Sequence, residues 1–369
     1  MNHNKRVIHL VNGEFYAGAE RVQDILAQKL PRLGYDVKLA CLKPDKFLSR
    51  CQCNRDMIIK FPMRSRIDLI PTFKIARYIR KKNIVLIHAH IPRTVMIGRI
   101  VSIFTNVPLI YHVHSPTLES THQYYKNKVN SVVEDISIKG IIKIITVSKS
   151  LKKHLIRKGF DKKKISVVPN GVPTTGPLEP RKNPNRKWTI GMIALFRPLK
   201  GVEVLLKALS LLLREKNDIQ LRLIGPFESN IYKTSMEKLA RELDIEKNIK
   251  WVGFKKNIIK ELKKIDILAF PSLYAEGMPM VIIEAMGAGV PLVCSKLESI
   301  PEIIRQGVDG LLVKPGDPED LEKAISVIIE DTEKRSMMRK NAYNRQVAHF
   351  SDIVMAKNTA KIYDQILEQ

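Results

Sequence analysis

The sequence predicts an α/β protein built from two doubly wound parallel sheets. Short apolar runs alternate with amphipathic segments along nearly the whole chain, which is typical of parallel strands joined by helices. A stretch containing Pro173, Pro177, Pro180 and Pro184 interrupts this alternation, and proline is excluded from helix interiors and central strands. The length of 369 residues also favours two domains.

The first half contains seven apolar runs of strand length. We expect strands at Val7–Val11, Asp36–Cys41, Met57–Phe61, Ile84–His88, Leu109–Val113, Ile141–Val147 and Ile165–Val168. Apolar residues recur at helical spacing between these runs. They predict helices over residues 19–33, 67–82, 93–104, 124–138 and 149–158.

The second half repeats the same plan. Strands are expected at Trp188–Ala194, Gln220–Ile224, Ile249–Val252, Ile267–Phe270, Val290–Cys294 and Gly310–Val313. Helices are expected over residues 201–215, 229–243, 256–264, 279–288 and 317–330. Residues 331–369 carry helical periodicity without strands and predict two more helices.

Basic residues are concentrated in the first half. Residues 1–180 contain 32 Lys and Arg against 12 Asp and Glu, whereas residues 181–369 contain 31 against 25. A lysine-rich genome would raise both halves alike, so the asymmetry favours an anionic partner for the first half: a membrane surface, a phosphorylated lipid or nucleic acid. Aromatic residues are few and no nucleic-acid-binding module is recognisable, which disfavours nucleic acid.

Other sequence features predict a cytoplasmic protein. No apolar run reaches the roughly 18–20 residues of a membrane-spanning helix, and the N-terminus lacks the pattern of a signal peptide. The four cysteines do not resemble a disulfide framework. Cys51 and Cys53 form a lone pair without the second pair that a zinc site needs.

Residues 266–294 are the most informative segment. Two buried-strand runs flank a loop with Glu276 and Gly277, and a helix can begin at Pro279, where a missing N–H does no harm. That helix is apolar except for Glu284, whose carboxylate needs a polar partner. A helix N-terminus gathers anions, and open α/β sheets bind ligands at the carboxyl ends of their strands. A ligand with both phosphates and hydroxyls, such as a nucleotide sugar, would satisfy these groups.

The spacing of Glu276 and Glu284, with Glu-Gly-Met-Pro at 276–279, resembles the signature of the retaining nucleotide-sugar glycosyltransferases of family 4. The resemblance implies the GT-B fold: two Rossmann-like, doubly wound, parallel-sheet domains that face each other across a cleft. The alternative is structural, with Glu284 pairing with a buried Arg or capping a backbone group.

The resemblance also implies domain roles. Residues 1–172 would form an N-terminal Rossmann-like domain that binds the acceptor, and residues 173–187 the proline-rich linker. Residues 188–345 would form the Rossmann-like domain that binds the nucleotide sugar. In GT-B enzymes a C-terminal helix, here within residues 346–369, usually returns to the N-terminal domain.

Cations follow the first strand of the second half. Arg197 offers a planar fork for phosphate oxygens and Lys200 a point charge, and Lys200-Gly201 opens a helix. A helix N-terminus disfavours cations unless an anion bridges them. The segment resembles the phosphate clamp of family 4, although many members carry the arginine further upstream, where this chain has Leu195. The chain has no Asp-x-Asp motif, so we expect no metal ion and no other cofactor.

Two further positions lie in the first half. Gly18, in the loop after the first strand, permits close approach of phosphate to backbone N–H groups, and the loop resembles the Gly-Gly-Ala/Thr-Glu loop of the family with Ala17 in place of the first glycine. His88 and His90, and likewise His112 and His114, stand in pairs at strand ends. Core filling and a metal pair without an obvious third ligand are the alternatives to the family role, a contact of His114 with the donor sugar.

Within the signature, the resemblance assigns Glu284 to the ribose hydroxyls. Glu276 would hold a sugar hydroxyl and steady positive charge at the anomeric carbon. The loop over Gly277, Met278, Pro279 and Met280 would present backbone N–H groups to the phosphates or the sugar. His114 and Glu276 are the expected catalytic residues.

The segment 67–82 has a basic face and an apolar stripe. Such a helix can lie on an anionic membrane, but a helix that packs on its own sheet shows the same stripe. We expect peripheral attachment to the inner face of the membrane.

The sequence thus favours a retaining, metal-independent hexosyltransferase that moves a sugar from a nucleotide-diphosphate sugar to a lipid-linked or glycan acceptor. Polysaccharide, lipopolysaccharide or glycolipid synthesis would be its setting. A nucleotide-sugar epimerase or phosphorylase of the same architecture is the alternative enzyme, and a basic nucleic-acid-binding protein is the alternative outside catalysis.

Overall fold

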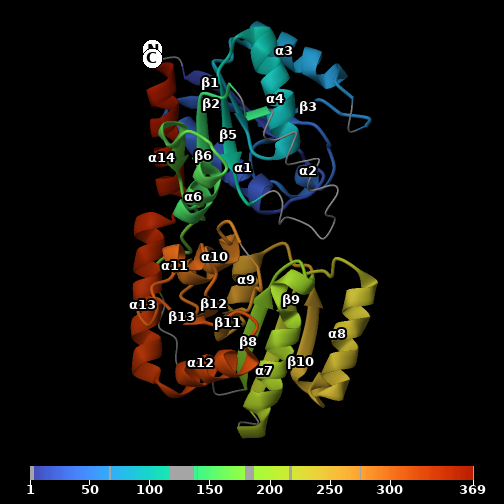
Figure 1. Cartoon of the computed structure of the whole chain (residues 1–369), viewed down its shortest axis with the longest axis vertical. Coiled ribbons are helices and arrows are strands. Elements are labelled where there is room, and N and C mark those ends of the chain that lie inside the picture. The colour runs from blue at the N-terminus through green and yellow to red at the C-terminus, as the bar shows by residue number, and fades with distance from the viewer. Residues whose placement is uncertain are drawn as a thin grey trace. The chain divides into compact units, whose positions relative to one another are not determined.

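A computed structural model of the chain describes residues 4–65, 68–116, 137–138, 140–178, 187–215, 218–274 and 276–368 (Figure 1). The chain divides into two compact units. Unit 1 contains residues 1–172 together with 351–369, and unit 2 contains residues 173–350. Most of the predicted helix 124–138 lies outside the described residues.

Unit 1 is built on a seven-stranded sheet of order β3-β2-β1-β4-β5-β6-β7, in which every neighbouring pair is parallel. The strands are β1 (Lys5–Val11), β2 (Tyr35–Cys41), β3 (Ile58–Lys60), β4 (Leu86–Ala89), β5 (Leu109–Val113), β6 (Lys143–Thr146) and β7 (Ile165–Val167). The helices are α1 (Gly18–Lys29), α2 (Lys46–Arg50), α3 (Ile70–Lys82), α4 (Pro92–Thr105), α6 (Lys149–Arg157) and α14 (Asp352–Leu367).

Unit 2 is built on a six-stranded parallel sheet of order β10-β9-β8-β11-β12-β13. Its strands are β8 (Trp188–Ile193), β9 (Ile219–Ile224), β10 (Ile249–Gly253), β11 (Ile267–Phe270), β12 (Leu292–Ser295) and β13 (Leu311–Val313). Its helices are α7 (Val202–Glu215), α8 (Asn230–Glu242), α9 (Ile258–Leu262), α10 (Met280–Gly287), α11 (Ile300–Ile303), α12 (Pro318–Glu330) and α13 (Thr332–His349). The prediction of two doubly wound parallel sheets is therefore confirmed.

Several predicted boundaries were wrong for local reasons. The helix expected over 19–33 ends as α-helix at Lys29 and continues as a 3₁₀ turn, Leu30–Leu33, because Pro31 cannot donate an i→i−4 hydrogen bond. The helix expected from residue 67 begins at Ile70, where the Asp68 carboxylate accepts the Ile70 N–H at 3.0 Å. The short helices α2 and α11 were not predicted.

The C-terminal helix α14 belongs to unit 1. It packs against α1, and the Lys29 ammonium lies 2.9 Å from the Asp352 carboxylate at the start of α14. Near the end of α14 the Tyr35 hydroxyl donates to Asp364 at 2.5 Å. These contacts join the last helix to α1 and β2, near the other end of the sequence.

The core of unit 1 contains a cluster of histidines next to Tyr363 of α14. The Tyr363 hydroxyl lies 2.8 Å from His9 Nε2 on β1 and 2.6 Å from His88 Nδ1 on β4. A hydroxyl has one hydrogen, so it donates to one ring and accepts from the other. His112 of β5 stacks on His88 at 5.5 Å between ring centroids, and both its ring nitrogens are buried without a hydrogen-bond partner.

Burial keeps this cluster neutral. Burial lowers the pKa of His9 and of His114 to about 3. It also lowers the pKa of the three other clustered histidines, His88, His90 and His112, well below the usual value. Burial also raises the pKa of Tyr363 well above that of a free tyrosine.

We predict that the protein loses stability on acidification. The folded-state pKa values lie below those of the unfolded chain, so between about pH 6.5 and pH 3 the unfolded chain binds more protons than the folded chain. The stabilisation is therefore complete above about pH 7 and falls with pH, by up to about 1.4 kcal/mol per pH unit for each of these histidines. Urea unfolding at about pH 7.5, 6.5 and 5.5 measures the loss.

A matched variant tests the source of this effect. His112→Leu replaces one buried imidazole with an apolar side chain. The unfolding free energy of this variant should change less steeply with pH, because the unfolded variant binds about one proton fewer than the unfolded original chain. Stability that is independent of pH over the same interval would contradict a neutral, buried cluster.

Candidate functional site

Two of the predicted residues of unit 2, Lys200 and Glu276, meet where the strand order reverses. From β8 the chain proceeds outward to β9 and β10 on one side, and β11, β12 and β13 follow on the other side. The loops after β8 and β11 therefore emerge side by side at the carboxyl edge of the sheet, which is the usual ligand position in open α/β sheets.

Gly201 allows these two loops to approach each other. It adopts φ +69°, and a Cβ at this position would lie 2.1 Å from the carbonyl oxygen of Pro271. The loops are then joined by hydrogen bonds to the Leu199 carbonyl, from the Leu273 N–H at 2.9 Å and from the Ser272 hydroxyl at 3.0 Å. Lys200 ends a 3₁₀ turn, and α7 begins only at Val202, so the predicted helix starting at 201 was wrong by one residue.

Lys200 and Glu276 form an ion pair across the two loops. Their side chains are only 14% and 19% exposed, so the carboxylate is the anion that balances Lys200 in this structure. The Ser272 hydroxyl also lies 2.8 Å from Glu276 Oε1, and the Ser299 hydroxyl donates to the Glu276 backbone carbonyl at 2.5 Å. The ammonium lies 5.8 Å from the centre of the Phe270 ring.

The remaining unit 2 residues lie on the same two loops and on α10. Arg197 is half-buried, three residues before Lys200, and its carbonyl accepts the Lys200 N–H at 2.8 Å. The α10 helix begins at Met280, with Pro279 as its N-cap rather than its first residue. Glu284, on the second turn of α10, is 4% exposed. The side chains of Met278 and Met280 are buried in this loop, next to the buried Gly277.

Unit 1 repeats the arrangement at its own reversal, between β1 and β4. Arg93, at the start of α4, donates to Asn12 Oδ1 at 3.2 Å and lies 4.0 Å from the Glu14 carboxylate. Lys43 pairs with Glu14 at 2.8 Å, and this hydrogen bond lowers the pKa of Glu14. This network was not predicted. Its only sequence signal is polar residues placed directly after apolar strands.

Gly18 is exposed at the start of α1, and a Cβ there would meet nothing within 4 Å. Space for a ligand is therefore present, but the fold itself does not require this glycine. The required glycine is Gly13, with φ +85° and a Cβ position 2.5 Å from the Lys43 carbonyl oxygen. The sequence analysis did not identify Gly13 as the glycine that the fold of this loop requires, and the role of Gly18 toward phosphate stays a prediction.

His114 is paired with a histidine of the neighbouring strand end. Its Nε2 lies 3.0 Å from His90 Nδ1, the ring planes differ by 15°, and the ring centroids are 5.3 Å apart. The two nitrogens thus face each other along the line between the rings, as in a linear N–H···N hydrogen bond. The other ring nitrogen of His114, Nδ1, is buried without a hydrogen-bond partner.

The sequence showed no third ligand for a histidine metal site, but the structure brings a third histidine close to each pair. His90, His112 and His114 bring ring nitrogens within 4.8 Å of one another, as do His9, His88 and His90. The geometry nevertheless favours hydrogen bonding, because the facing nitrogens of His90 and His114 point at each other instead of converging on a third point. In the other group the Tyr363 hydroxyl already contacts one ring nitrogen of His9 and one of His88.

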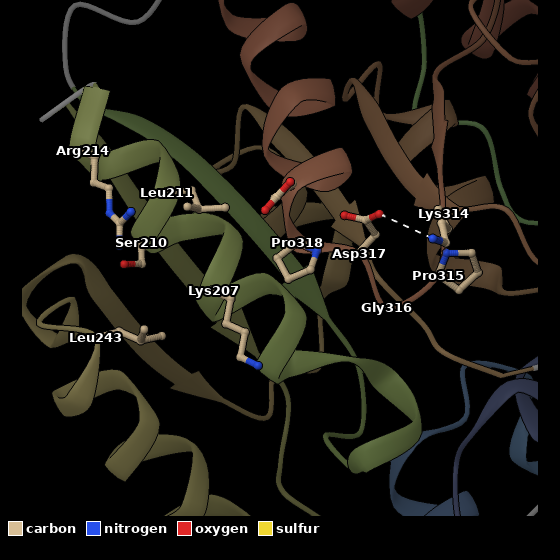
Figure 2. A pocket seen from close by; sticks show the side chains of 11 residues that line it. Lys207, Ser210, Leu211, Arg214, Leu243, Lys314, Pro315, Gly316, Asp317 and Pro318 are labelled. Carbon is tan, nitrogen blue, oxygen red and sulfur yellow. Dashed lines mark ion pairs between the residues drawn. The ribbon is translucent and has the colours of Figure 1, made fainter.

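A pocket of about 430 Å³ lies elsewhere in unit 2, between α7 and the loop that leads into α12 (Figure 2). Figure 2 shows Lys207 and Arg214 on α7 opposite Lys314 and Asp317, which form an ion pair of 3.9 Å. None of the predicted site residues lines it. Its mixture of cations and carboxylates favours no single class of ligand.

Comparison with known proteins identifies the family. The model of glycosyltransferase family 4 matches residues 16–175, and that of glycosyl transferases group 1 matches residues 178–345. An Escherichia coli UDP-Gal:alpha-D-GlcNAc-diphosphoundecaprenol alpha-1,3-galactosyltransferase is 24% identical over 393 residues, covering 99% of this chain and 98% of that protein.

Two further known proteins, one compared by sequence and one by structure, are also similar to this chain. The Campylobacter jejuni N,N'-diacetylbacillosaminyl-diphospho-undecaprenol alpha-1,3-N-acetylgalactosaminyltransferase is 28% identical over 186 residues, about half of each chain. The structure of Anabaena Alr3699/HepE in complex with UDP-glucose superposes with a TM-score of 0.84 at 22% identity, covering 98% of this chain and 99% of that one. The chain therefore belongs to glycosyltransferase family 4 and has the GT-B fold.

Proposed function

We propose that this glycosyltransferase moves a hexose from a UDP-hexose to a lipid-linked acceptor in the synthesis of a cell-envelope polysaccharide or glycolipid. The observation that carries the proposal is the partly buried pair of Lys200 and Glu276 at the strand-order reversal of unit 2. The E. coli and C. jejuni relatives are named for diphosphoundecaprenol-linked acceptors, and the Anabaena structure holds UDP-glucose.

The donor would be held by complementary charges. Lys200 and Arg197 would face the diphosphate, together with backbone N–H groups at Gly277, Met278 and Met280 at the start of α10. Glu276 would accept a hydrogen bond from a sugar hydroxyl, and Glu284 from the ribose. In this structure Glu276 balances Lys200, so the diphosphate would add a second anion to a cation that is already positioned.

We propose retention of the anomeric configuration without a metal ion. The acceptor oxygen would bond to the anomeric carbon on the face from which the diphosphate leaves, and the departing phosphate oxygen would take the acceptor's proton. The sequence has no Asp-x-Asp motif to hold a divalent ion, and side-chain cations can neutralise the leaving group instead. In unit 1, Gly18 would let a phosphate approach backbone N–H groups, and His114 would contact the sugar.

Product analysis tests this function. The chain is incubated with UDP-galactose, UDP-glucose or UDP-N-acetylglucosamine and a short-chain diphosphoprenol-linked sugar, with and without EDTA. Mass spectrometry should show one added sugar, NMR an α linkage, and EDTA no effect. Isomerised donor without acceptor would indicate an epimerase, free sugar phosphate a phosphorylase, and a β linkage would contradict retention.

We predict that Lys200→Met and Glu276→Gln each lower kcat/KM by about 10²–10³-fold, because each removes a charge that acts on the transition state. The two side chains are in contact, so the double variant should lose less than the product of the single losses. Steady-state kinetics of all three variants measures this coupling.

Lys207→Met is the matched control. Lys207 is an α7 lysine that lines the separate pocket of Figure 2. The kcat/KM of the Lys207→Met variant should stay within about twofold of that of the original enzyme. Fully additive losses, or an equal loss in the control, would contradict direct action of Lys200 and Glu276 as a pair.

Glu284→Gln should weaken UDP and UDP-hexose by the same factor, about tenfold, because the ribose is common to both. Calorimetric titration of each ligand measures the two affinities. Glu261 offers a control, since it is also buried but binds Arg222 at 2.9 Å and Lys264 at 2.7 Å. Glu261→Gln should lower the melting temperature and leave UDP affinity unchanged. Unchanged UDP affinity in Glu284→Gln would refute the ribose role.

A further inference from the structure

Unit 1 exposes a group of large apolar side chains on α3 and α4, here called the α3–α4 patch. Their exposed fractions lie between 41% and 62%. The patch consists of Leu69, Ile70, Phe73, Ile103 and Phe104. Ile70 and Phe73 are one helical turn apart, and the rings of Phe73 and Phe104 lie 5.4 Å apart between centroids, so the two helices contribute to one continuous surface.

The patch is not the face that packs α3 on the sheet. That face is a separate stripe of buried residues, Ile75, Ala76 and Ile79. The sequence could not distinguish a membrane face from a packing face on this segment. The structure shows that α3 has both, with the packing face satisfied inside the unit and Phe73 turned to the exterior.

Cations outnumber carboxylates around the patch, although Asp68 lies just before the start of α3 and accepts the Ile70 N–H. Residues 69–116 contain seven Lys and Arg and no Asp or Glu. On the exposed side of α3 these cations follow directly after the apolar residues, at Lys74, Arg77, Arg80 and Lys81. The Arg80 guanidinium donates to the carbonyl of Phe104, which places this cation at the border of the patch.

We propose that the α3–α4 patch is the surface by which the enzyme docks on a bilayer containing anionic lipid. Apolar side chains would enter the boundary between headgroups and acyl chains, and the flanking cations would meet lipid phosphates. Charge complementarity selects this occupant, because an uncharged protein surface would leave at least four cations without a counter-charge. The inference rests on the proposed lipid-linked acceptor for its purpose but not for its geometry.

The attachment is peripheral. Among the residues that the structure describes, none of the helices is long and apolar enough to cross a membrane. Binding should therefore depend on both the apolar contact and the surface charge of the lipid, and it should weaken with salt.

Flotation with vesicles tests the docking, using the full chain without donor or acceptor. Vesicles of phosphatidylcholine alone are compared with vesicles containing about one-third phosphatidylglycerol, and each cation near the anionic surface should add about fivefold to the partition coefficient. Phe73→Ser/Phe104→Ser and Lys74→Glu/Arg77→Glu/Lys81→Glu should each lower binding to anionic vesicles by at least about tenfold.

Unit 2 supplies matched controls. Ile231→Ser/Met337→Ser removes two side chains that are 86% and 52% exposed, and Lys247→Glu/Lys323→Glu/Lys340→Glu reverses three exposed charges. Both controls should bind vesicles within about twofold of the original chain. Circular dichroism confirms that all variants fold, which is expected because every substituted side chain is on the surface.

The outcomes separate this proposal from the proposed function. Patch variants should retain transfer to a short-chain, water-soluble acceptor and lose transfer to the same acceptor in anionic vesicles. Failure of transfer to the soluble acceptor in the original chain would refute the function alone. Equal binding to both vesicle types, vesicle binding that survives in the patch variants, or a dimer that Phe73→Ser/Phe104→Ser dissociates without vesicle binding would overturn the docking.

Discussion

The close approach of the loops after β8 and β11 is the constraint on which the site of unit 2 depends. Gly201 permits it, since any Cβ there would collide with the Pro271 carbonyl. The approach brings Lys200 to Glu276 and lets Ser272 reach both loops. A largely buried cation without its carboxylate would be costly, so the same contact that positions the two charges also makes each depend on the other.

Unit 1 also has a strand-order reversal, between β1 and β4, but different side chains lie beside it. Its loops at the β1–β4 reversal are joined by the partly buried ion pairs of Glu14, whereas the strand ends beside them carry neutral imidazoles. The His90–His114 hydrogen bond links the tautomers of the two rings, because a single proton lies between the facing nitrogens. Any donor or acceptor role of the outer nitrogen of His114 is thus set by His90.

Much of this architecture could be predicted from the sequence, because buried parallel strands are continuous apolar runs. Leu109–Val113 and Ile267–Phe270 were predicted to the residue. Lys200 and Glu276 were each expected to bind the nucleotide sugar. Their contact with each other was not expected, because no local sequence pattern encodes which side chains meet across two loops. For the same reason the contact of His9 with Tyr363, 354 residues away, had no sequence signal.

The charge asymmetry of the sequence and the neutral histidine cluster of unit 1 have separate causes. Residues 1–180 carry 32 cations against 12 carboxylates. Burial, followed by the repulsion of neighbouring histidine rings, lowers the pKa of His88, His90 and His112 and keeps them uncharged. Unit 1 can therefore present a strongly cationic exterior, including the border of the α3–α4 patch, while the polar interior beside its strand ends remains uncharged. Cations at the surface attract anionic partners without placing an unpaired charge in the core.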